Sequence, residues 1–590
     1  MNPEPKDGAF AIGCNYWASH AGMYMWRRWD AACVKDDLKA LKALGMNALR
    51  VFPLWPDFQP LERLAGGAGV TRGWAQRGGP LQNDACLDEE MVRRFRFLCD
   101  EADALGLRLV VGLITGWMSG RVFVPPAFDG VNVLTDPDAI EWQVRFVRRF
   151  VRETRDCRAI AAWDLGNECN CLWTDADGTG RPSRRAAAWV WMNAIVSAIR
   201  LEDASRPVVS GMHGCSSDRL RPWSLHDQGE LTDMVTTHPY PLFTPHCNHR
   251  PFDSFVNVLH PVAESLFYEG IARRPCLVEE AGCLGPNIAS DARAAWTLGK
   301  GALASRVYGL RGYLWWCAFD QEHLDFPPYD WVALERELGL LRADRSTKEQ
   351  GAALRRTAEE IAALDGLPPR RIDATCLVSE SENAWPQSFG AFLLAVQAGL
   401  SIDFASAEEP LPKAAAFILP AGSSSETYSG GALRRLMAAV NDGASLLVTY
   451  GEGMMLSRLE ELTGCRVESS CASPWETRVA VGDRTVALSG KKTTLVSATR
   501  ARVLLRDGDG NPFATVCDYG RGKVAFVNCA LERLAVERAD CFDPARLNPA
   551  YLIYAVAADA LGIARADPAK PPFVSLTVHG ERQVSIDLSR

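Results

Sequence analysis

The chain has 590 residues, of which 47% are hydrophobic and 23% are charged, with a formal net charge of -8. A single hydrophobic core stops growing beyond roughly 250 to 300 residues, so this length excludes one compact domain and predicts two or three. The composition excludes a disordered or fibrous protein. The negative charge argues against a nucleic-acid or anionic-membrane partner, because such surfaces attract an excess of Lys and Arg.

No targeting or membrane segment is evident in the sequence. Residues Met1 to Asp7 contain no basic stretch leading into an apolar one, so we expect a cytoplasmic protein. The longest apolar stretch, Ala186 to Ile199, is too short to cross a bilayer and predicts a buried helix. The eighteen cysteines include no Cys-x-x-Cys pair, so we expect reduced, buried thiols rather than disulfides.

From Phe10 to Ala318, short apolar runs alternate with longer segments of helical periodicity, as in repeated βα units around a parallel sheet. Eight such units in roughly 300 residues match a (β/α)8 barrel. A doubly wound open sheet is the alternative, but it more often has a Gly-rich phosphate turn where this chain has Gly13-Cys14-Asn15-Tyr16-Trp17. The predicted strands are Phe10–Asn15, Asn47–Phe52, Leu107–Ile114, Ile160–Leu165, Pro207–Met212, Asp233–Thr237, Cys276–Glu280 and Gly312–Cys317. The predicted helices are Val34–Leu44, Glu89–Ala104, Pro137–Arg155, Arg184–Glu202, Phe255–Ala272 and Asp291–Tyr308.

The pattern changes after the barrel. We expect a catalytic barrel over residues 1–345, a helical linker over 346–370, an α/β domain over 371–566 and a small C-terminal β hairpin over 567–590. The α/β domain is predicted to contain a flavodoxin-like layer, followed by a β-rich stretch from Thr477 to Asn528 and a closing helix over Tyr551–Leu561. The layer's predicted strands are Ile372–Val378, Ala414–Leu419 and Ala444–Thr449, and its helices are Pro386–Ala398, Gly431–Asn441 and Leu456–Leu462.

Glutamates stand at the carboxyl ends of two predicted barrel strands, where a (β/α)8 barrel carries its chemistry. Glu168 follows strand four, and Glu279 and Glu280 end strand seven. These strands lie three positions apart around the ring, so a carboxylate from each can flank a bound sugar. Retaining glycoside hydrolysis needs one protonated carboxyl that donates to the leaving oxygen and a second that attacks the anomeric carbon across about 5 Å. If only one of these glutamates stood at a strand end, an ordinary loop carboxylate would be the better interpretation.

The barrel resembles glycoside hydrolase family 5 over about the first 345 residues. In Leu165-Gly166-Asn167-Glu168 the family's Asn-Glu pair implies that Glu168 is the acid/base and that Asn167 contacts the sugar 2-hydroxyl. Glu280-Ala281-Gly282 is similar to the family's Glu-aromatic-Gly and implies that Glu280 is the nucleophile. Ala281 departs from the usual aromatic residue, and the neighbouring Glu279 is an alternative nucleophile, although alternation along a strand lets only one of the two address the substrate.

Other strand-end residues match the same resemblance. Arg50 corresponds to the family's strand-two arginine, whose cation keeps the nucleophile ionised. His238 and Tyr240, in Thr237-His238-Pro239-Tyr240, correspond to the residues after strand six, where the tyrosine contacts the nucleophile. Without the resemblance, Arg50 is equally consistent with a structural ion pair, and the His-Pro-Tyr segment with a plain turn.

Tryptophans also fall at predicted strand ends. Trp316 resembles the strand-eight tryptophan that forms the floor of the subsite for the scissile sugar, with Trp315 as the alternative. Trp17 and Trp117 lie at the ends of strands one and three, where an indole can serve as a sugar platform. The histidine that the family often has near strand three is replaced by Ile114-Thr115-Gly116-Trp117.

Two segments contain His or Cys residues close enough in sequence to suggest a metal site. His246-Cys247-Asn248-His249 and Cys169-x-Cys171 both lack the spacings that zinc sites favour, so a loop without metal is the expectation for each. We predict no metal and no cofactor.

The second domain resembles the amidotransferase-like trimerisation domain of family 42 β-galactosidases. A working amidotransferase of that type needs a cysteine in a sharp strand-to-helix turn, and the turn Tyr450-Gly451-Glu452-Gly453-Met454 has none. We therefore expect a structural domain that assembles a homo-oligomer, with a homotrimer as the expected form.

The combined resemblance implies a retaining, exo-acting β-glycosidase, with an oligosaccharide substrate. It favours a β-mannosidase that hydrolyses mannose β-linked to N-acetylglucosamine or short manno-oligosaccharides. The alternatives are a β-galactosidase, a β-glucosidase or an endo-β-mannanase of the same clan. From another class, a carbohydrate-binding or assembly protein on a degenerate barrel is also considered. The long segment after strand two, Pro53 to Leu87, is expected to close one end of the site.

Overall fold

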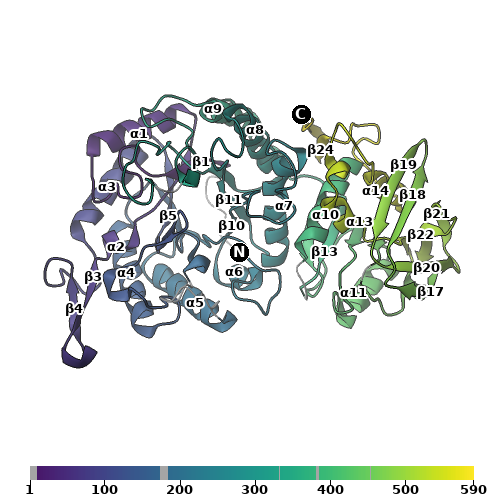
Figure 1. Ribbon diagram of the computed structural model, residues 1–590, viewed down its shortest axis with the longest axis horizontal. Coiled ribbons are helices and arrows are strands. Elements are labelled where there is room, and N and C mark those ends of the chain that lie inside the picture. The colour runs from purple at the N-terminus through teal and green to yellow at the C-terminus, as the bar shows by residue number, and fades with distance from the viewer. Residues whose placement is uncertain (1–8, 173–183, 331–332, 381–383, 452) are drawn as a thin grey trace. The chain divides into compact units, whose positions relative to one another are not determined.

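The computed structural model describes residues 9–172, 184–330, 333–380, 384–451 and 453–590 (Figure 1). The N-terminal segment Met1–Asp7 and Glu452 therefore lie outside the described residues. The chain divides into two compact units. The barrel unit comprises Met1–Tyr240, Arg274–Arg306 and Leu310–Asp365, and the C-terminal unit comprises Pro241–Arg273, Val307–Gly309 and Gly366–Arg590.

Eight parallel strands form the sheet of the barrel unit, in the order β10-β11-β12-β1-β2-β5-β8-β9. A single parallel bridge between Val209 and Met234 joins β9 to the segment before β10 and closes the ring. The fold is therefore the predicted (β/α)8 barrel, and each strand matches one of the eight predicted runs, although β1 and β11 extend one residue beyond theirs. The strands are β1 (Ala11–Tyr16), β2 (Ala48–Val51), β5 (Arg108–Gly112), β8 (Ile160–Asp164), β9 (Val208–Val209), β10 (Val235–Thr237), β11 (Cys276–Ala281) and β12 (Gly312–Trp315).

Helices surround these strands (Figure 1). Several begin where the sequence provides a capping residue: the side chains of Asp30, Asp88 and Asp136 accept hydrogen bonds from backbone N–H groups of the first turns of α1, α3 and α4. The helices are α1 (Ala31–Ala43), α3 (Glu89–Ala104), α4 (Pro137–Thr154), α5 (Arg185–Glu202), α6 (Leu225–Leu231), α8 (Asp291–Tyr308) and α9 (Glu349–Ala362). The helix α7 (Phe255–Ala272) belongs to the C-terminal unit.

Several short elements of the barrel unit were missing from the prediction, among them the two-residue strands β6 (Trp117–Met118) and β7 (Arg121–Val122). The segment after β2 contains the short helix α2 (Trp55–Phe58) and the hairpin β3 (Leu61–Ala65) and β4 (Thr71–Gln76). Each of these elements is short and the tip of the hairpin is rich in glycine, so neither the helical period of 3.6 residues nor the strand period of 2 stands out in the sequence. The helix α6 is only seven residues long, which is too short to show helical periodicity.

A seven-stranded sheet forms the centre of the C-terminal unit, in the order β14-β13-β15-β16-β23-β22-β21. The first five strands in this order are parallel, and β22 and β21 run antiparallel to their neighbours. The strands are β13 (Ala374–Val378), β14 (Ile402–Ser406), β15 (Ala416–Leu419), β16 (Ser445–Thr449), β21 (Arg502–Arg506), β22 (Pro512–Tyr519) and β23 (Gly522–Val527).

The remaining elements of this unit are helices and two-stranded ribbons. The helices are α10 (Trp385–Ala398), α11 (Gly430–Asn441), α12 (Leu459–Thr463), α13 (Leu531–Glu537) and α14 (Tyr551–Leu561). The ribbons pair β17 (Cys465–Cys471) with β20 (Thr493–Ala498), β18 (Trp475–Val481) with β19 (Arg484–Gly490), and β24 (Val574–His579) with β25 (Arg582–Asp587).

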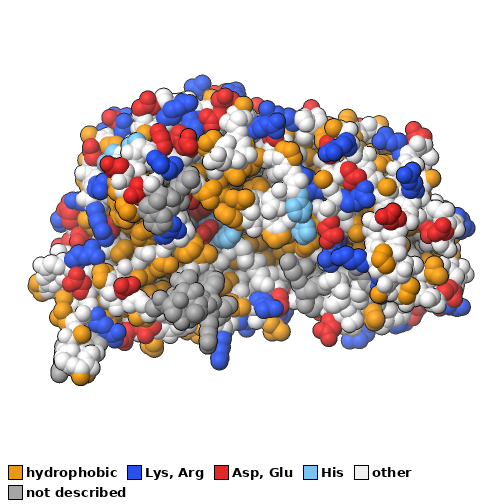
Figure 2. Space-filling view, in the orientation of Figure 1, with side chains coloured by type: hydrophobic (Ala, Val, Ile, Leu, Met, Phe, Trp, Pro, Cys, Tyr) orange, Lys and Arg blue, Asp and Glu red, His pale blue; other side chains and the backbone are white. Residues whose placement is uncertain are grey.

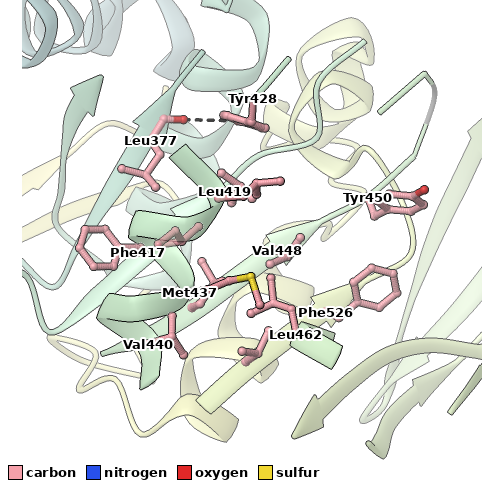
Figure 3. Packing of buried hydrophobic residues seen from close by; sticks show 14 of the residues in the cluster. Leu377, Phe417, Leu419, Tyr428, Met437, Val440, Val448, Tyr450, Leu462 and Phe526 are labelled. Atoms are coloured by element: carbon pink, nitrogen blue, oxygen red, sulfur yellow. Dashed lines mark hydrogen bonds between the residues drawn. The ribbon is translucent and has the colours of Figure 1, made fainter. Parts of the chain in front are cut away.

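Helical spacing explains how α11 packs on this sheet. Leu433, Leu436, Met437 and Val440 are buried at intervals of three and four residues, which puts them on one face of the helix. Figure 3 shows Met437 and Val440 directed toward buried strand residues of the same cluster, including Val448. This cluster forms a hydrophobic core of the unit.

The surface and the cysteines agree with the composition. Figure 2 shows Lys and Arg interspersed with Asp and Glu over the visible face. All eighteen cysteines are free thiols, and most are buried. Within the described ranges, no helix has the length and apolarity that crossing a membrane requires.

Candidate active site

The turn after β8 places Glu168 at the carboxyl end of the barrel. Glu168 has a φ of 44°, and its backbone N–H donates to the carbonyl oxygen of Gly211 at 2.8 Å. Gly211 has a φ of 63°, and a Cβ there would lie 2.0 Å from Asp164 Oδ1. Glycine at 211 therefore permits the close approach of two chain segments that holds the Glu168 turn.

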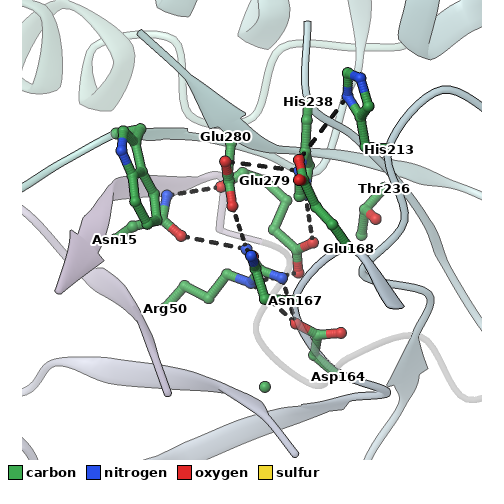
Figure 4. A network of polar contacts seen from close by, with 12 residues as sticks. Asn15, Arg50, Asp164, Asn167, Glu168, His213, Thr236, His238, Glu279 and Glu280 are labelled. Carbon is green, nitrogen blue, oxygen red and sulfur yellow. Dashed lines mark hydrogen bonds and ion pairs between the residues drawn. The ribbon is translucent and has the colours of Figure 1, made fainter. Parts of the chain in front are cut away.

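Arg50 connects three strand ends in the interior of the barrel (Figure 4). Its Nε and Nη2 donate to Asp164 Oδ2 at 2.9 and 2.7 Å, and its Nη1 donates to Glu280 Oε1 at 2.7 Å. The same Nη1 donates to Asn167 Oδ1 at 2.9 Å, and Nε lies 3.3 Å from Glu279 Oε1. A fully buried guanidinium thus neutralises part of a cluster of carboxylates.

His238 stands between two carboxylates. Its Nδ1 lies 2.7 Å from Glu168 Oε1, and its Nε2 lies 3.2 Å from Glu279 Oε2. The same Nδ1 lies 3.6 Å from Glu280 Oε2. These distances to one nitrogen put the two oxygens of Glu168 and Glu280 within about 6 Å of each other.

Glu280 and Glu279 have different surroundings although they are adjacent in β11. Glu280 accepts from Arg50 through Oε1 and from the Tyr240 hydroxyl through Oε2, the latter at 2.8 Å. Glu279 is completely buried, whereas Glu280 retains 4% of its surface. Only Glu280 contacts Tyr240. Both side chains nevertheless reach Arg50 and His238, so the two do not face opposite sides as strand alternation predicts. The pairing of β11 with β12 shifts in register between Val278 and Ala281, which interrupts the alternation.

Burial and mutual charge shift the acidities of these groups. Burial favours a neutral Glu168, but the hydrogen bond from His238 and the nearby His213 lower the pKa of Glu168 to about 2. Burial opposes a charged His238, but Glu280, Glu168 and Glu279 raise the pKa of His238 to about 10. Burial, together with the charge of Glu168, raises the pKa of Glu280 above its usual range. The directions of these shifts favour a protonated His238 beside an ionised Glu168.

The three predicted tryptophans differ in their contacts. Trp117 Nε1 donates to Glu168 Oε2 at 3.1 Å, which brings it into the site. Trp316 Nε1 donates to Glu335 Oε2 at 3.2 Å, whereas Trp315 is buried with its Nε1 on the carbonyl of Leu338. Trp17 is 2% exposed and its ring stacks on Phe52, so it packs behind the site and has little surface to offer a sugar.

The structure adds residues that the sequence reasoning did not select. Asp164 and Asn15 contact Arg50, and a charged residue inside the apolar run of β8 was the available signal for Asp164. His213 lies after β9 with Nδ1 3.9 Å from Glu168 Oε1, and the side chain of Asn170 holds its backbone by hydrogen bonds in both directions. Glu335 follows β12, where the sequence has no distinguishing pattern.

One group of side chains in the site could ligate a metal ion, although the sequence predicts no metal. Glu168, His213 and His238 offer donor atoms within 4.8 Å of one another, an arrangement that could hold an ion. In the structure, the nearest of these atoms already pair with each other as carboxylate and imidazole. His246 and His249 have ring centroids 5.8 Å apart, and within the described ranges neither joins a group of three such donors.

Comparison with known proteins was made by sequence and by structure. No protein-family model matches the chain. Among curated proteins, the chain is 24% identical over 234 residues to mannan endo-1,4-beta-mannosidase A of Podospora anserina, which covers 39% of this chain and 56% of that protein. The chain thus spans about half the length of the curated relative it matches.

Solved structures share the fold over much or nearly all of the chain. An exo-beta-1,4-mannosidase from Opitutaceae bacterium strain TAV5 has a TM-score of 0.72 at 22% identity, covering 94% of this chain and 96% of that chain. A GH5_18 protein from Streptomyces cattleya in complex with Manb1-4GlcNAc has a TM-score of 0.58 at 23% identity, covering 68% and 95%. The chain is therefore similar in fold to a solved exo-β-mannosidase over nearly all of its length.

Proposed function

We propose that the protein is a retaining β-glycosidase with Glu280 as nucleophile and Glu168 as acid/base. The main support is that Glu168 Oε1 and Glu280 Oε2 lie 2.7 and 3.6 Å from the same nitrogen of His238, so these two oxygens are at most about 6.3 Å apart. Retaining glycosidases have carboxyl groups about 5 to 5.5 Å apart, whereas inverting ones need about 6.5 to 9.5 Å to admit water. The separation therefore favours attack by a carboxylate.

Double displacement follows from the roles of these groups. In the first step Glu168 donates its proton to the glycosidic oxygen while a carboxylate oxygen of Glu280 bonds to the anomeric carbon, and the aglycone leaves as an alcohol. In the second step Glu168 removes a proton from water, whose oxygen displaces Glu280. Arg50 and Tyr240 stabilise the ionised nucleophile. The family resemblance implies that Asn167, whose Oδ1 accepts from Arg50, contacts the 2-hydroxyl.

The proposed substrate is mannose β-linked to N-acetylglucosamine or to short manno-oligosaccharides. The names of the similar proteins support it, since they are an exo-mannosidase, an endo-mannanase and a protein bound to Manb1-4GlcNAc. Exo action is proposed on the same ground, since the exo-mannosidase shares the fold over 94% of this chain.

The primary test measures hydrolysis of aryl β-mannoside, β-glucoside and β-galactoside by Glu168→Ala and Glu280→Ala. We expect kcat for the preferred sugar to fall about 100-fold or more in each variant, because each removes a group that acts on the reacting atoms. The matched control is Glu141→Ala, which removes an exposed carboxylate from α4 and should retain full activity. Near-normal turnover by either active-site variant would refute the two-carboxylate assignment.

Added azide separates the two roles. Glu168→Ala should yield a β-glycosyl azide, because azide attacks the glycosyl-enzyme, and Glu280→Ala should yield an α-glycosyl azide. If the two variants gave the opposite products, the roles assigned to Glu168 and Glu280 would be reversed. Mannohexaose distinguishes exo from endo action, since an exo enzyme releases mannose and mannopentaose first, whereas an endo enzyme releases mannobiose, mannotriose and mannotetraose at early times. Sugar binding by calorimetry with no turnover of any aryl glycoside would favour a binding protein.

A further inference from the structure

Glu279 has no part in the two-step mechanism, yet it is among the most enclosed charged groups of the site. Its side chain is completely buried, with Oε2 3.2 Å from His238 Nε2 and Oε1 3.3 Å from Arg50 Nε. The Asn15 side-chain amide donates to its backbone carbonyl at 3.0 Å, which fixes this part of β11. Burying a carboxylate is costly unless its charge is used or compensated.

The bonds around His238 require an extra proton. A neutral imidazole has one N–H group, and an ionised carboxylate can only accept. His238 is bonded to a carboxylate on each nitrogen, so one proton beyond the neutral ring must be present. With Glu279 accepting from Nε2–H, that proton lies between Nδ1 of His238 and Oε1 of Glu168.

We propose that Glu279 is a positioning residue that holds His238 with Nε2–H toward itself, so that Nδ1 stores the proton that Glu168 delivers to the leaving group. This inference rests on the proposed function, because it concerns the acid/base of that reaction. The stored proton moves from Nδ1 to Glu168 Oε1, which leaves a neutral imidazole and a neutral carboxyl. Glu168 then gives the proton to the glycosidic oxygen, and the proton taken from water in the second step returns by the reverse path.

The charges around His238 agree with this assignment. The carboxylates of Glu168, Glu279 and Glu280 face the ring, and His213 lies with its ring centroid 6.2 Å away. Three further groups touch or face these carboxylates. Arg50 pairs with Asp164, and the Tyr240 hydroxyl donates to Glu280. Glu335 interacts with Glu168 and Glu280 through charge. The pKa of His238 is raised and that of Glu168 lowered, as a proton stored on the ring requires.

The test is Glu279→Gln, with kcat/KM measured from pH 4 to 10 on two aryl β-glycosides. Loss of the charge weakens proton binding by the His238–Glu168 pair, so the basic limb should move to lower pH by about one unit. For a phenyl glycoside, which needs protonation of its leaving group, kcat/KM at pH 10, on this limb, should fall about fivefold. For a 2,4-dinitrophenyl glycoside, which does not, it should change less than about twofold.

A merely structural role predicts a different pattern. An equal loss on both substrates, or an unshifted basic limb, would overturn the proposal while leaving the proposed function intact. Retained turnover in Glu168→Ala would instead refute the proposed function itself. Melting temperature and circular dichroism check the folding of Glu279→Gln. If this variant fails to fold, His238→Gln decides, because it removes the proton store and should show the same selective loss on the phenyl glycoside.

Discussion

Arg50 shows how a single side chain organises this site. The site holds the carboxylates of Asp164, Glu168, Glu279 and Glu280 against the cations of Arg50 and His238, so negative charge is in excess. Such an excess raises the proton affinity of the groups that face it, and burial and Glu279 accordingly raise the pKa of Asp164 to about 7. The location of each hydrogen bond therefore decides which carboxyl stays ionised.

The Tyr240 hydroxyl provides a test of this balance. Its bond to Glu280 Oε2 favours the ionised form of this proposed nucleophile, so Tyr240→Phe should raise the pKa of Glu280 further. The acidic limb of kcat/KM should move to higher pH, because Glu280 must lose its proton before it can attack. A hydrogen bond to a charged group is worth about 1.5 to 3 kcal/mol, which predicts a loss of about 10- to 100-fold at the optimum.

Tyr519→Phe is the matched control for this measurement. It removes a hydroxyl that donates to Glu461 on the surface of the C-terminal unit, at 3.3 Å, and should leave the pH profile unchanged. An acidic limb that stays in place in Tyr240→Phe would show that this hydroxyl does not set the ionisation of Glu280.

At the scale of elements, the turn after β8 depends on the segment after β9. Gly211→Ala places a methyl group 2.0 Å from Asp164 Oδ1 and 2.2 Å from the Gly166 carbonyl oxygen, so one of the two segments must move. We expect a destabilisation of about 3 kcal/mol or more, measured by chemical denaturation, and nearly complete loss of activity. The activity is lost because the Glu168 backbone bonds directly to Gly211.

Gly214 offers a control with the same backbone strain. Its φ of 62° is almost that of Gly211, but no atom lies within 4 Å of where its Cβ would be. Gly214→Ala should therefore cost about 1 to 2 kcal/mol, the penalty for a left-handed backbone alone, and should retain activity. Equal effects of the two substitutions would mean that the close approach at Gly211 is unimportant.

The sequence predicted the barrel elements well because their periodicity is strong. Glu89–Ala104 and Phe255–Ala272 were predicted at the bounds that the structure has, since each is long and carries a clear apolar face or core. Strand ends could then be read for polar residues, which identified Glu168 and Glu280. His213 and Glu335 could not be found in this way, because they reach the site from loops whose paths depend on tertiary contacts.

At the scale of the whole molecule, the C-terminal unit remains proposed as an assembly domain. Three of its five parallel strands were predicted. β14 was missed because its alternating burial gives a short and weak pattern, and β23 was expected in the β-rich stretch rather than in this layer. We predict a particle with three times the mass of one chain in size-exclusion chromatography with light scattering. A monomeric mass at micromolar concentration would contradict the homotrimer and would leave the proposed chemistry untouched.

The seam between β9 and β10 has a consequence for how the protein loses activity. β9 spans only Val208–Val209, and one bridge from Val209 to Met234 closes the ring there. Fewer ladder bonds mean that this part of the barrel can open locally at a lower free energy than the rest. The adjacent segment includes Gly211, which holds the Glu168 turn. Amide hydrogens at the seam should then exchange with solvent early. Mild heating should inactivate the enzyme while most of its fold is still intact.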